Sequence, residues 1–209
     1  MEKQQADKEL YDRLASRIEK LQASLERAEE DASLDPLTGL ANRRTFDRVL
    51  SEWTSIGPDG GGFSLAMFDL DDFKTINDTY GHPVGDRVLL VTAQILQDSI
   101  RTGDLVGRYG GEEFVVLLKD CPIDLAEARL AKILESIATT RYEYEENGEV
   151  RALRFTASCG VTEFSDGEAQ ETLLQRADDA LYDAKKKGKN RVEVRKRSIF
   201  QSLFRRRAS

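Results

Sequence analysis

Two groups of carboxylates, far apart in the sequence, could together bind a metal ion. Asp69 follows the short apolar run 63–68, and Glu112 and Glu113 follow a pair of glycines further along the chain. The apolar run predicts a strand buried on both faces, and the glycines predict a hairpin turn. If the two strands are neighbours, their carboxylates lie together and repel one another unless a cation joins them. Oxygen ligands favour magnesium or manganese over zinc, so the spacing is compatible with a metal site, although solvated charges at strand ends are the plainer reading.

Polar residues between these carboxylates could bind a nucleotide. Phe73 and Lys74 open a predicted helical segment, and the first backbone amides of a helix are natural donors to phosphate. Asn77 and Asp86 suit a guanine edge, because the amide carbonyl accepts a hydrogen bond and the carboxylate accepts from the ring N–H and the exocyclic amine. His82 is the only histidine, and we interpret it as structural or adjacent to a substrate rather than as a general base.

The elements expected to position these residues follow an α+β order. In chain order they are a helix capped by Asn42, the strand 63–68, a helix over 84–100, a hairpin with strands 105–109 and 112–118, a helix around 130–137, a strand region over 150–162, a helix over 173–184 and a closing strand 191–194. This order resembles a ferredoxin-like palm, with a central, mostly antiparallel sheet flanked by helices. Asp35-Pro36 reads either as a helix start or as a turn, and Gly188 as a left-handed helix cap.

The N-terminal residues carry a heptad seam. Its apolar positions are Leu14, Ile18, Leu21, Leu25, Ala28 and Ala32, and the positions between them are mostly charged. So narrow a stripe is buried most readily against a second copy, so we predict a coiled-coil homodimer; a solvated helix packed on its own domain is the alternative. We therefore divide the chain into a stalk helix over 1–33, a globular domain over 34–194 and a basic tail over 195–209.

Composition narrows the class of protein. The chain has 209 residues, of which 40% are hydrophobic, enough for one ordinary core. Its net charge of -7 argues against a nucleic-acid binder, which needs a positive surface. Cys121 and Cys159 show neither metal-ligand nor disulfide spacing, and no apolar run could span a bilayer, so we expect a soluble, cytoplasmic protein with reduced thiols. For the basic tail we favour a solvated terminus over weak contact with an anionic membrane.

Five motifs in order resemble those of GGDEF-domain diguanylate cyclases. They are LDPLTGLANRR at 34–44, FDLDDFK at 68–74, NDTYGH at 77–82 with Gly85-Asp86, RYGGEEF at 108–114, and ALYDAK at 180–185 with Asn190-Arg191. The resemblance covers about three quarters of the chain, and the GGEEF spelling is an active variant in that family. It implies the GGDEF, nucleotidyl-cyclase palm fold and the condensation of two GTP molecules into cyclic di-GMP and two pyrophosphates.

The resemblance also implies site residues. Asp69, the Leu70 carbonyl and Glu112 would hold Mg²⁺ or Mn²⁺ against the GTP phosphates, Glu113 would support the second of two ions, and Glu112 would be the catalytic base. By the same resemblance Asn77 and Asp86 contact guanine, His82 lies near the substrate, and the Phe73 and Lys74 region contacts the phosphates together with Lys185. Lys189 stands where the family often has Arg, which leaves an ammonium for phosphate but loses the planar guanidinium.

Regulation follows from the same resemblance. Arg101 and Asp104 match the family's RxxD inhibitory site, at which the product binds; an ordinary surface ion pair is the alternative. Arg129 or Lys132 could belong to the surface that completes it. Because each domain resembles one GTP half-site, two domains must face each other, and the stalk would hold them together or let a regulatory protein control their encounter.

Three other functions remain as rivals. The first is a catalytically silent receptor for GTP or cyclic di-GMP that signals through its coiled coil. The second is another palm-type nucleotidyl transferase or purine cyclase. The third is a structural coiled-coil adaptor. The retained carboxylates Asp69, Glu112 and Glu113 argue against the receptor, because a receptor has no need of metal ligands.

Overall fold

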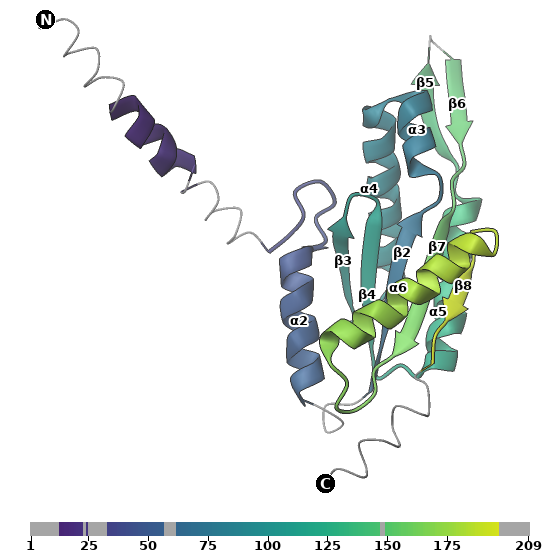
Figure 1. Cartoon of the computed structure of the whole chain (residues 1–209). Coiled ribbons are helices and arrows are strands. Elements are labelled where there is room, and N and C mark those ends of the chain that lie inside the picture. Colours follow the sequence, from purple (N-terminus) through teal and green to yellow (C-terminus); the bar gives the residue numbers. More distant parts are fainter. Residues whose placement is uncertain (1–12, 23, 25–32, 57–61, 147–148, 197–209) are drawn as a thin grey trace, which may run out of the picture. The chain divides into compact units, whose positions relative to one another are not determined.

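The structure, a computed structural model, describes residues 13–22, 24, 33–56, 62–146 and 149–196 (Figure 1). The chain divides into two compact units, Met1–Ser33 and Leu34–Ser209. In the first unit, residues 13–22 are helical, and the seam residues Leu14, Ile18 and Leu21 are exposed. The other seam positions, Leu25, Ala28 and Ala32, lie outside the described residues, as does most of the basic tail. The coiled coil therefore stays a prediction.

The second unit is built on a six-stranded mixed sheet with the order β1-β3-β4-β2-β7-β8. Its strands are β1 Ala41–Asn42, β2 Phe63–Leu70, β3 Leu105–Gly110, β4 Glu113–Lys119, β7 Ala157–Glu163 and β8 Val192–Val194. The three central pairings are antiparallel, and the two outer ones, β1 with β3 and β7 with β8, are parallel. The predicted α+β fold with a mostly antiparallel central sheet is confirmed.

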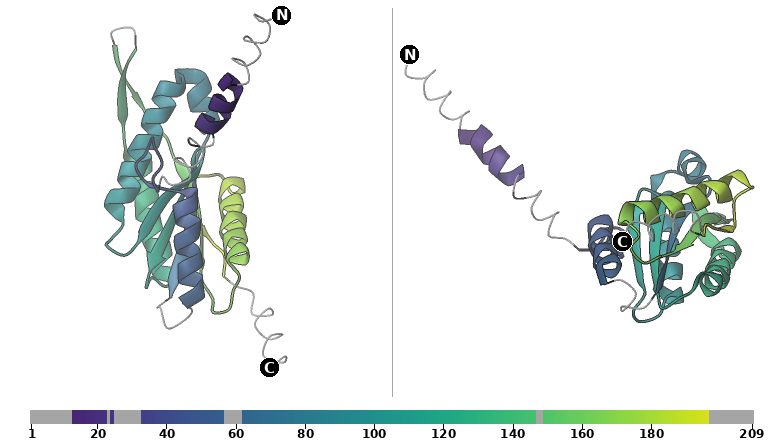
Figure 2. Two further views of the ribbon diagram at one scale, coloured as in Figure 1. Left: turned by 90° about the vertical axis from the view of Figure 1, so that its left-hand side faces the viewer. Right: turned by 60° about the horizontal axis from the view of Figure 1, so that its bottom comes forward.

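Helices cover both faces of this sheet (Figure 2). One face carries α2 and α6, and the other carries α3, α4 and α5; their bounds are α2 Arg43–Ile56, α3 Phe73–Tyr80, α4 His82–Ser99, α5 Ile123–Thr139 and α6 Gln170–Lys186. Along β2 the side chains alternate, so that Leu65 and Met67 pack in the core under α2 and α6 while Ala66 and Phe68 pack in the other core. The same alternation places Asp69 on the α2 and α6 face.

Local capping follows the sequence closely. The Thr45 N–H donates to Asn42 Oδ1 at 2.9 Å, which caps α2 as predicted. Residues 36–38 form a turn rather than a helix start, because Asp35 Oδ1 accepts hydrogen bonds from both the N–H and the hydroxyl of Thr38.

The end of α6 is closed by the predicted glycine cap. Gly188 has a φ of 111°, and the Lys189 N–H bonds back to the Ala184 carbonyl at 3.0 Å. The bond from the Gly188 N–H to the Lys185 carbonyl completes a Schellman motif. This turn brings residues 189–191 back towards the sheet.

Three predicted boundaries were wrong. The strand region 150–162 is two strands, because β6 Glu149–Leu153 leaves the main sheet and pairs with β5 Tyr142–Glu146, which the sequence analysis missed. The hairpin turn lies at Gly111 and Glu112 rather than at the two glycines, since a bulge near Arg108 lets β3 continue through Gly110. Helix α4 begins two residues before the predicted Val84, with Pro83 in its first turn.

Two further findings concern membrane-spanning helices and the two cysteines. None of the described helices is long and apolar enough to cross a membrane. Cys121 and Cys159 are both unpaired and buried, as expected for reduced thiols, and burial raises the pKa of the Cys159 thiol well above its usual value.

Candidate active site

The register of β2 against β4 brings the predicted carboxylates together. Asp69 lies directly opposite Glu113 in this antiparallel pair, and both side chains are on the α2 and α6 face. Glu112 lies in the adjoining turn, where its carbonyl accepts a hydrogen bond from the Leu70 N–H at 3.3 Å. The predicted proximity of Asp69 to the two glutamates is confirmed, and their roles stay predictions.

The field at this end of the sheet is negative. Burial, and then the charge of Asp69, raise the pKa of Glu112 above its usual value, and the neighbouring Glu113 adds to the rise. Burial, Asp69 and Asp178 likewise raise the pKa of Glu113. Lys185 opposes both shifts. The carboxylates therefore have an excess of negative charge that a bound cation would relieve.

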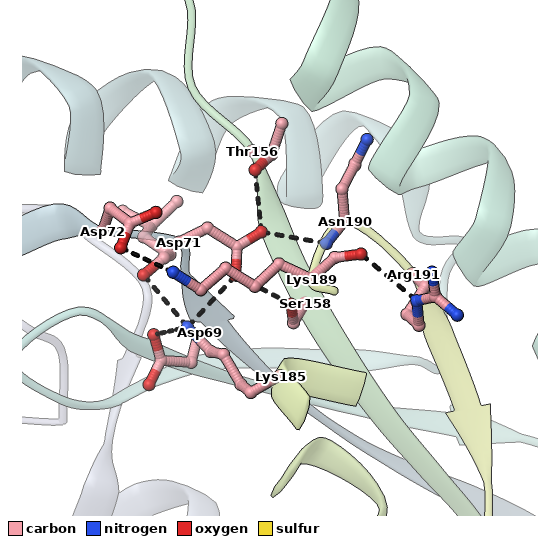
Figure 3. Close-up of polar contacts among 10 residues, drawn as sticks. Asp69, Asp71, Asp72, Thr156, Ser158, Lys185, Lys189, Asn190 and Arg191 are labelled. Atoms are coloured by element: carbon pink, nitrogen blue, oxygen red, sulfur yellow. Dashed lines mark hydrogen bonds and ion pairs between the residues drawn. The ribbon is translucent and has the colours of Figure 1, made fainter. Parts of the chain in front are cut away.

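Lys185 places its ammonium group against the Asp69 carboxylate (Figure 3). Its Nζ lies 2.6 Å from Asp69 Oδ1 and 3.2 Å from both the Leu70 carbonyl oxygen and Asp71 Oδ1. Two of these three oxygens belong to residues predicted to bind the metal. The lysine comes from the last turn of α6, which crosses β7 and β2 on this face.

Asp71 is a site residue that the sequence analysis left out. Only 5% of it is exposed, and its carboxylate accepts hydrogen bonds from the hydroxyls of Thr156 and Ser158, both at 2.7 Å, and from the Asn190 N–H at 3.1 Å. It therefore ties the end of β2 to β7 and to the turn after α6 (Figure 3). Its only sequence signal was its place in an acidic run, which does not distinguish a buried carboxylate from a solvated one.

A second lysine meets the same acidic run. Lys189 Nζ lies 2.6 Å from Asp72 Oδ1, in a pair that is largely exposed. Asp72, Lys189 and Asn190 all have positive φ values, of 55°, 63° and 47°, so both segments bend sharply where they meet. Lys189 thus lies beside the start of α3, the helix predicted to receive phosphate.

The donors fit a divalent cation by their chemistry. Carboxylate and carbonyl oxygens are the ligands that Mg²⁺ and Mn²⁺ prefer, and Asp69 and Leu70 already present one of each to the Lys185 ammonium. Within the part of the chain that the structure describes, no three His, Cys, Asp or Glu side chains are grouped to hold a metal ion.

The corner between α3 and α4 positions the predicted guanine residues. A Cβ on Gly85 would overlap the Asn77 side chain, so Gly85 is what lets Asn77 lie against the first turn of α4. Asp86 follows at once and is exposed, as is His82 at the start of that helix. Asn77 is partly exposed. The corner thus carries the two residues predicted to contact guanine, and also His82, which was predicted to lie near the substrate.

The phosphate prediction for Phe73 concerns its backbone N–H and stays a prediction. Lys74 is exposed on the first turn of α3, but the Phe73 ring is buried in the core under α4. An aromatic ring at that point anchors the helix, so only the backbone of Phe73 is available to a ligand.

The RxxD pair also differs from the prediction. The Asp104 side chain is 0% exposed, and its oxygens accept hydrogen bonds from the backbone N–H groups of Arg101 and Lys119 and from the Arg129 guanidinium at 2.7 Å. Arg101 bonds to the Lys119 carbonyl and stays about half exposed. In this conformation the Asp104 carboxylate faces the protein and is closed to solvent, so a guanine edge would reach it only after a rearrangement.

A contact between distant motifs was not anticipated. Arg108 donates to the Gly111 carbonyl in the hairpin turn and to both Asp35 oxygens, at 3.2 and 3.3 Å. Burial opposes ionisation, yet the hydrogen bonds from Thr38 and the charge of Arg108 lower the pKa of Asp35 below its usual value. The hairpin that carries Glu112 is thereby fixed to the turn at the beginning of the domain.

Comparison with known proteins agrees with these motifs. Residues 32–191 match the family described as "Diguanylate cyclase, GGDEF domain". The chain is 42% identical over 171 residues to the diguanylate cyclase DgcP of Pseudomonas aeruginosa, an alignment that covers 81% of this chain and 25% of DgcP. The chain therefore spans about a quarter of that relative's length.

Two solved structures are similar over most of the chain. The coiled coil and GGDEF domain of DgcB from Caulobacter crescentus, in complex with cyclic di-GMP, matches with a TM-score of 0.75 and 32% identity, covering 89% of this chain and 99% of that one. The diguanylate cyclase SiaD from Pseudomonas aeruginosa, in complex with its activator SiaC, matches with a TM-score of 0.72 and 39% identity, covering 92% and 74%. The fold, the motifs and the family match agree, and the chain belongs to the GGDEF family of diguanylate cyclase domains.

Proposed function

We propose that this chain condenses two GTP molecules into cyclic di-GMP and two pyrophosphates. The observation that carries the proposal is the β2 and β4 register, which puts Asp69 opposite Glu113 and beside Glu112, facing Lys185. A receptor without catalysis would have no use for this concentration of negative charge around an oxygen-donor site. The GGEEF spelling of the hairpin is part of the proposal, as an active variant of the motif.

Each residue has a chemical task in this reaction. Glu112 accepts the proton from the attacking 3′-hydroxyl of one GTP, and a carboxylate whose pKa is raised is better suited to that transfer. The new bond joins that oxygen to the α-phosphorus of the other GTP, and the bond to pyrophosphate breaks. Two Mg²⁺ or Mn²⁺ ions per site, when bound, polarise the phosphates and stabilise the charge on the leaving group.

Binding residues surround that centre. Asp69, the Leu70 carbonyl, Glu112 and Glu113 are the proposed metal ligands. For the phosphates we propose Lys185, Lys189, Lys74 and the first backbone amides of α3. Asn77 and Asp86 bind the guanine base, and His82 lies close to the substrate.

A homodimer completes the reaction in this proposal, because one domain supplies one GTP. Leu14, Ile18 and Leu21 give the stalk an exposed apolar stripe for pairing. The similar DgcB structure includes a coiled coil, and SiaD was solved with an activator protein, which supports a paired stalk and a regulatory partner. Product inhibition at Arg101 and Asp104 is likewise proposed, with the Arg129 bond opening when the product binds.

The test is product analysis of the purified chain after bound nucleotide has been removed. With GTP and magnesium, mass-resolved chromatography should find cyclic di-GMP from the parent, and Glu112→Ala should lower its rate by about 10²- to 10⁴-fold. Glu135→Ala, at an exposed position on α5, is the matched control and should keep the parent rate. A nucleotide-free dimer that binds GTP but forms no product would favour the receptor.

A further inference from the structure

The position of Lys185 has a consequence for metal binding. Its ammonium lies on Asp69 Oδ1 and on the Leu70 carbonyl, which are two of the oxygens proposed to bind the metal. A lone pair that accepts from an ammonium is not free for a divalent ion, and the lysine charge repels such an ion at this range. In the absence of a nucleotide, lysine and metal therefore compete for the same oxygens.

The lysine is held in this position by a buried partner. Asp71 Oδ1 lies 3.2 Å from Nζ, and the Asp71 carboxylate is itself fixed by Thr156, Ser158 and the Asn190 N–H. Asp69 and Lys185 by contrast are about a quarter exposed, so a ligand from solvent can reach the pair. Phosphate oxygens would offer the ammonium a partner in place of the two oxygens.

We propose that Lys185 is a resident substitute cation that blocks bare metal from the site until a nucleotide phosphate draws the ammonium away. Metal and nucleotide then bind with positive coupling, because each favours the state in which Lys185 has left Asp69 and Leu70. This inference rests on the proposed function for the identity of the nucleotide and for Asp69 and Leu70 as metal ligands, and on the observed contacts of Lys185 for the competition.

The experiment measures Mn²⁺ binding to the full chain by electron paramagnetic resonance, without nucleotide. Lys185→Met should bind Mn²⁺ about tenfold more tightly than the parent, since it frees both oxygens and removes a repelling charge. Adding a GTP analogue that cannot react should tighten Mn²⁺ binding to the parent much more than to Lys185→Met.

Lys187→Met is the matched control. It removes the same charge from an exposed pair with Glu193, two residues after Lys185, but leaves the ligand oxygens of Asp69 and Leu70 as they are. Its Mn²⁺ affinity should stay within about threefold of the parent. Equal tightening in both variants, or none in Lys185→Met, would overturn the inference. If Lys185→Met does not fold, the same comparison is made with Lys185→Gln.

The two proposals fail separately in these measurements. A parent that forms no cyclic di-GMP, together with a Lys185→Met variant that binds Mn²⁺ tightly, would refute the cyclase and leave the substitute cation standing. A parent that forms the product, with unchanged Mn²⁺ affinity in the variant, would do the reverse.

Discussion

Arg176 lies in the second turn of α6 and Lys185 in its last turn, and the two cations differ in how completely their charge is satisfied. Arg176 is 9% exposed and donates two hydrogen bonds to Glu168, at 2.8 and 2.6 Å. Its remaining N–H groups bond to the Thr162 hydroxyl and to the carbonyls of Glu163 and Arg195. All five donors of the guanidinium are used, so this end of α6 fixes the chain beyond β8.

Around Lys185, the negative charge of the carboxylates exceeds the positive charge of the lysine. One ammonium is shared by two carboxylates and a carbonyl, while Glu112 and Glu113 lie close enough to Asp69 for its charge to raise both pKa values. A saturated, buried pair serves the fold, whereas a partly exposed site with excess negative charge is suited to exchange its partner for a ligand. Helix α6 thus carries both a residue that stabilises the fold, Arg176, and a residue of the candidate site, Lys185.

The largest effect should come from breaking the saturated pair. Arg176→Met leaves Glu168 buried without its partner and should lower the free energy of unfolding by about 3–5 kcal/mol, measured by urea denaturation. Lys185→Met should cost no more than about 1 kcal/mol, as a partly exposed pair does. Arg48→Met, in an exposed pair with Glu52, is the control and should change little. Similar losses for Arg176→Met and Lys185→Met would remove the distinction between the two ends.

A smaller effect should come from the point where α6 crosses the sheet between these ends. Gly160 of β7 touches the backbone of Ala177 and Leu181, and an added Cβ would come closer than 3.0 Å to both. Gly160→Ala should therefore push α6 outwards, lowering stability by about 1–3 kcal/mol and cyclase activity as well, because Lys185 moves with the helix.

Gly62→Ala is the matched control for that variant, since a Cβ there meets nothing within 4 Å. Both variants are compared by denaturation and by the rate of cyclic di-GMP formation. A Gly160→Ala protein with normal activity would show that the position of Lys185 does not depend on the helix contact.

The smallest effect concerns the excess negative charge, and in particular the Glu113 carboxylate. Because burial and Asp69 raise the pKa of Glu113 above its ordinary value of 4.5, the folded chain holds this proton more tightly than the unfolded chain does. The glutamate then lowers stability progressively as pH rises from that value through the raised pKa. Glu113→Gln lacks this loss, so its melting temperature should exceed that of the parent at neutral pH.

That advantage should shrink as the pH falls to the ordinary glutamate pKa, where the parent is protonated in both states. Melting curves across this range check the prediction, with Glu135→Gln as the exposed control. An advantage of constant size at every pH would mean that the substitution acts through packing rather than charge.

The sequence alone predicted the features that depend on neighbours along the chain. The short apolar run 63–68 predicted a buried strand, Asn42 and Gly188 predicted helix ends, and the order of elements predicted the α+β palm. The sequence also predicted that Asp69 would meet Glu112 and Glu113 if their strands were neighbours. Strands β2 and β4 do pair with one another. Helix caps and apolar runs depend on residues that are close in sequence, so they can be predicted without knowing the tertiary structure.

Only the tertiary structure decided which charges have partners. Asp71 and Asp72 are adjacent in sequence, yet Asp71 is buried on Thr156 and Ser158 while Asp72 is exposed. Asp104 reads as a surface acceptor, but Arg129 and two backbone amides enclose it. The partners of each carboxylate come from distant segments, and burial depends on all of them at once. For that reason the sequence could locate the charged residues of the site, and the folded chain determined which of them remain free to bind a ligand.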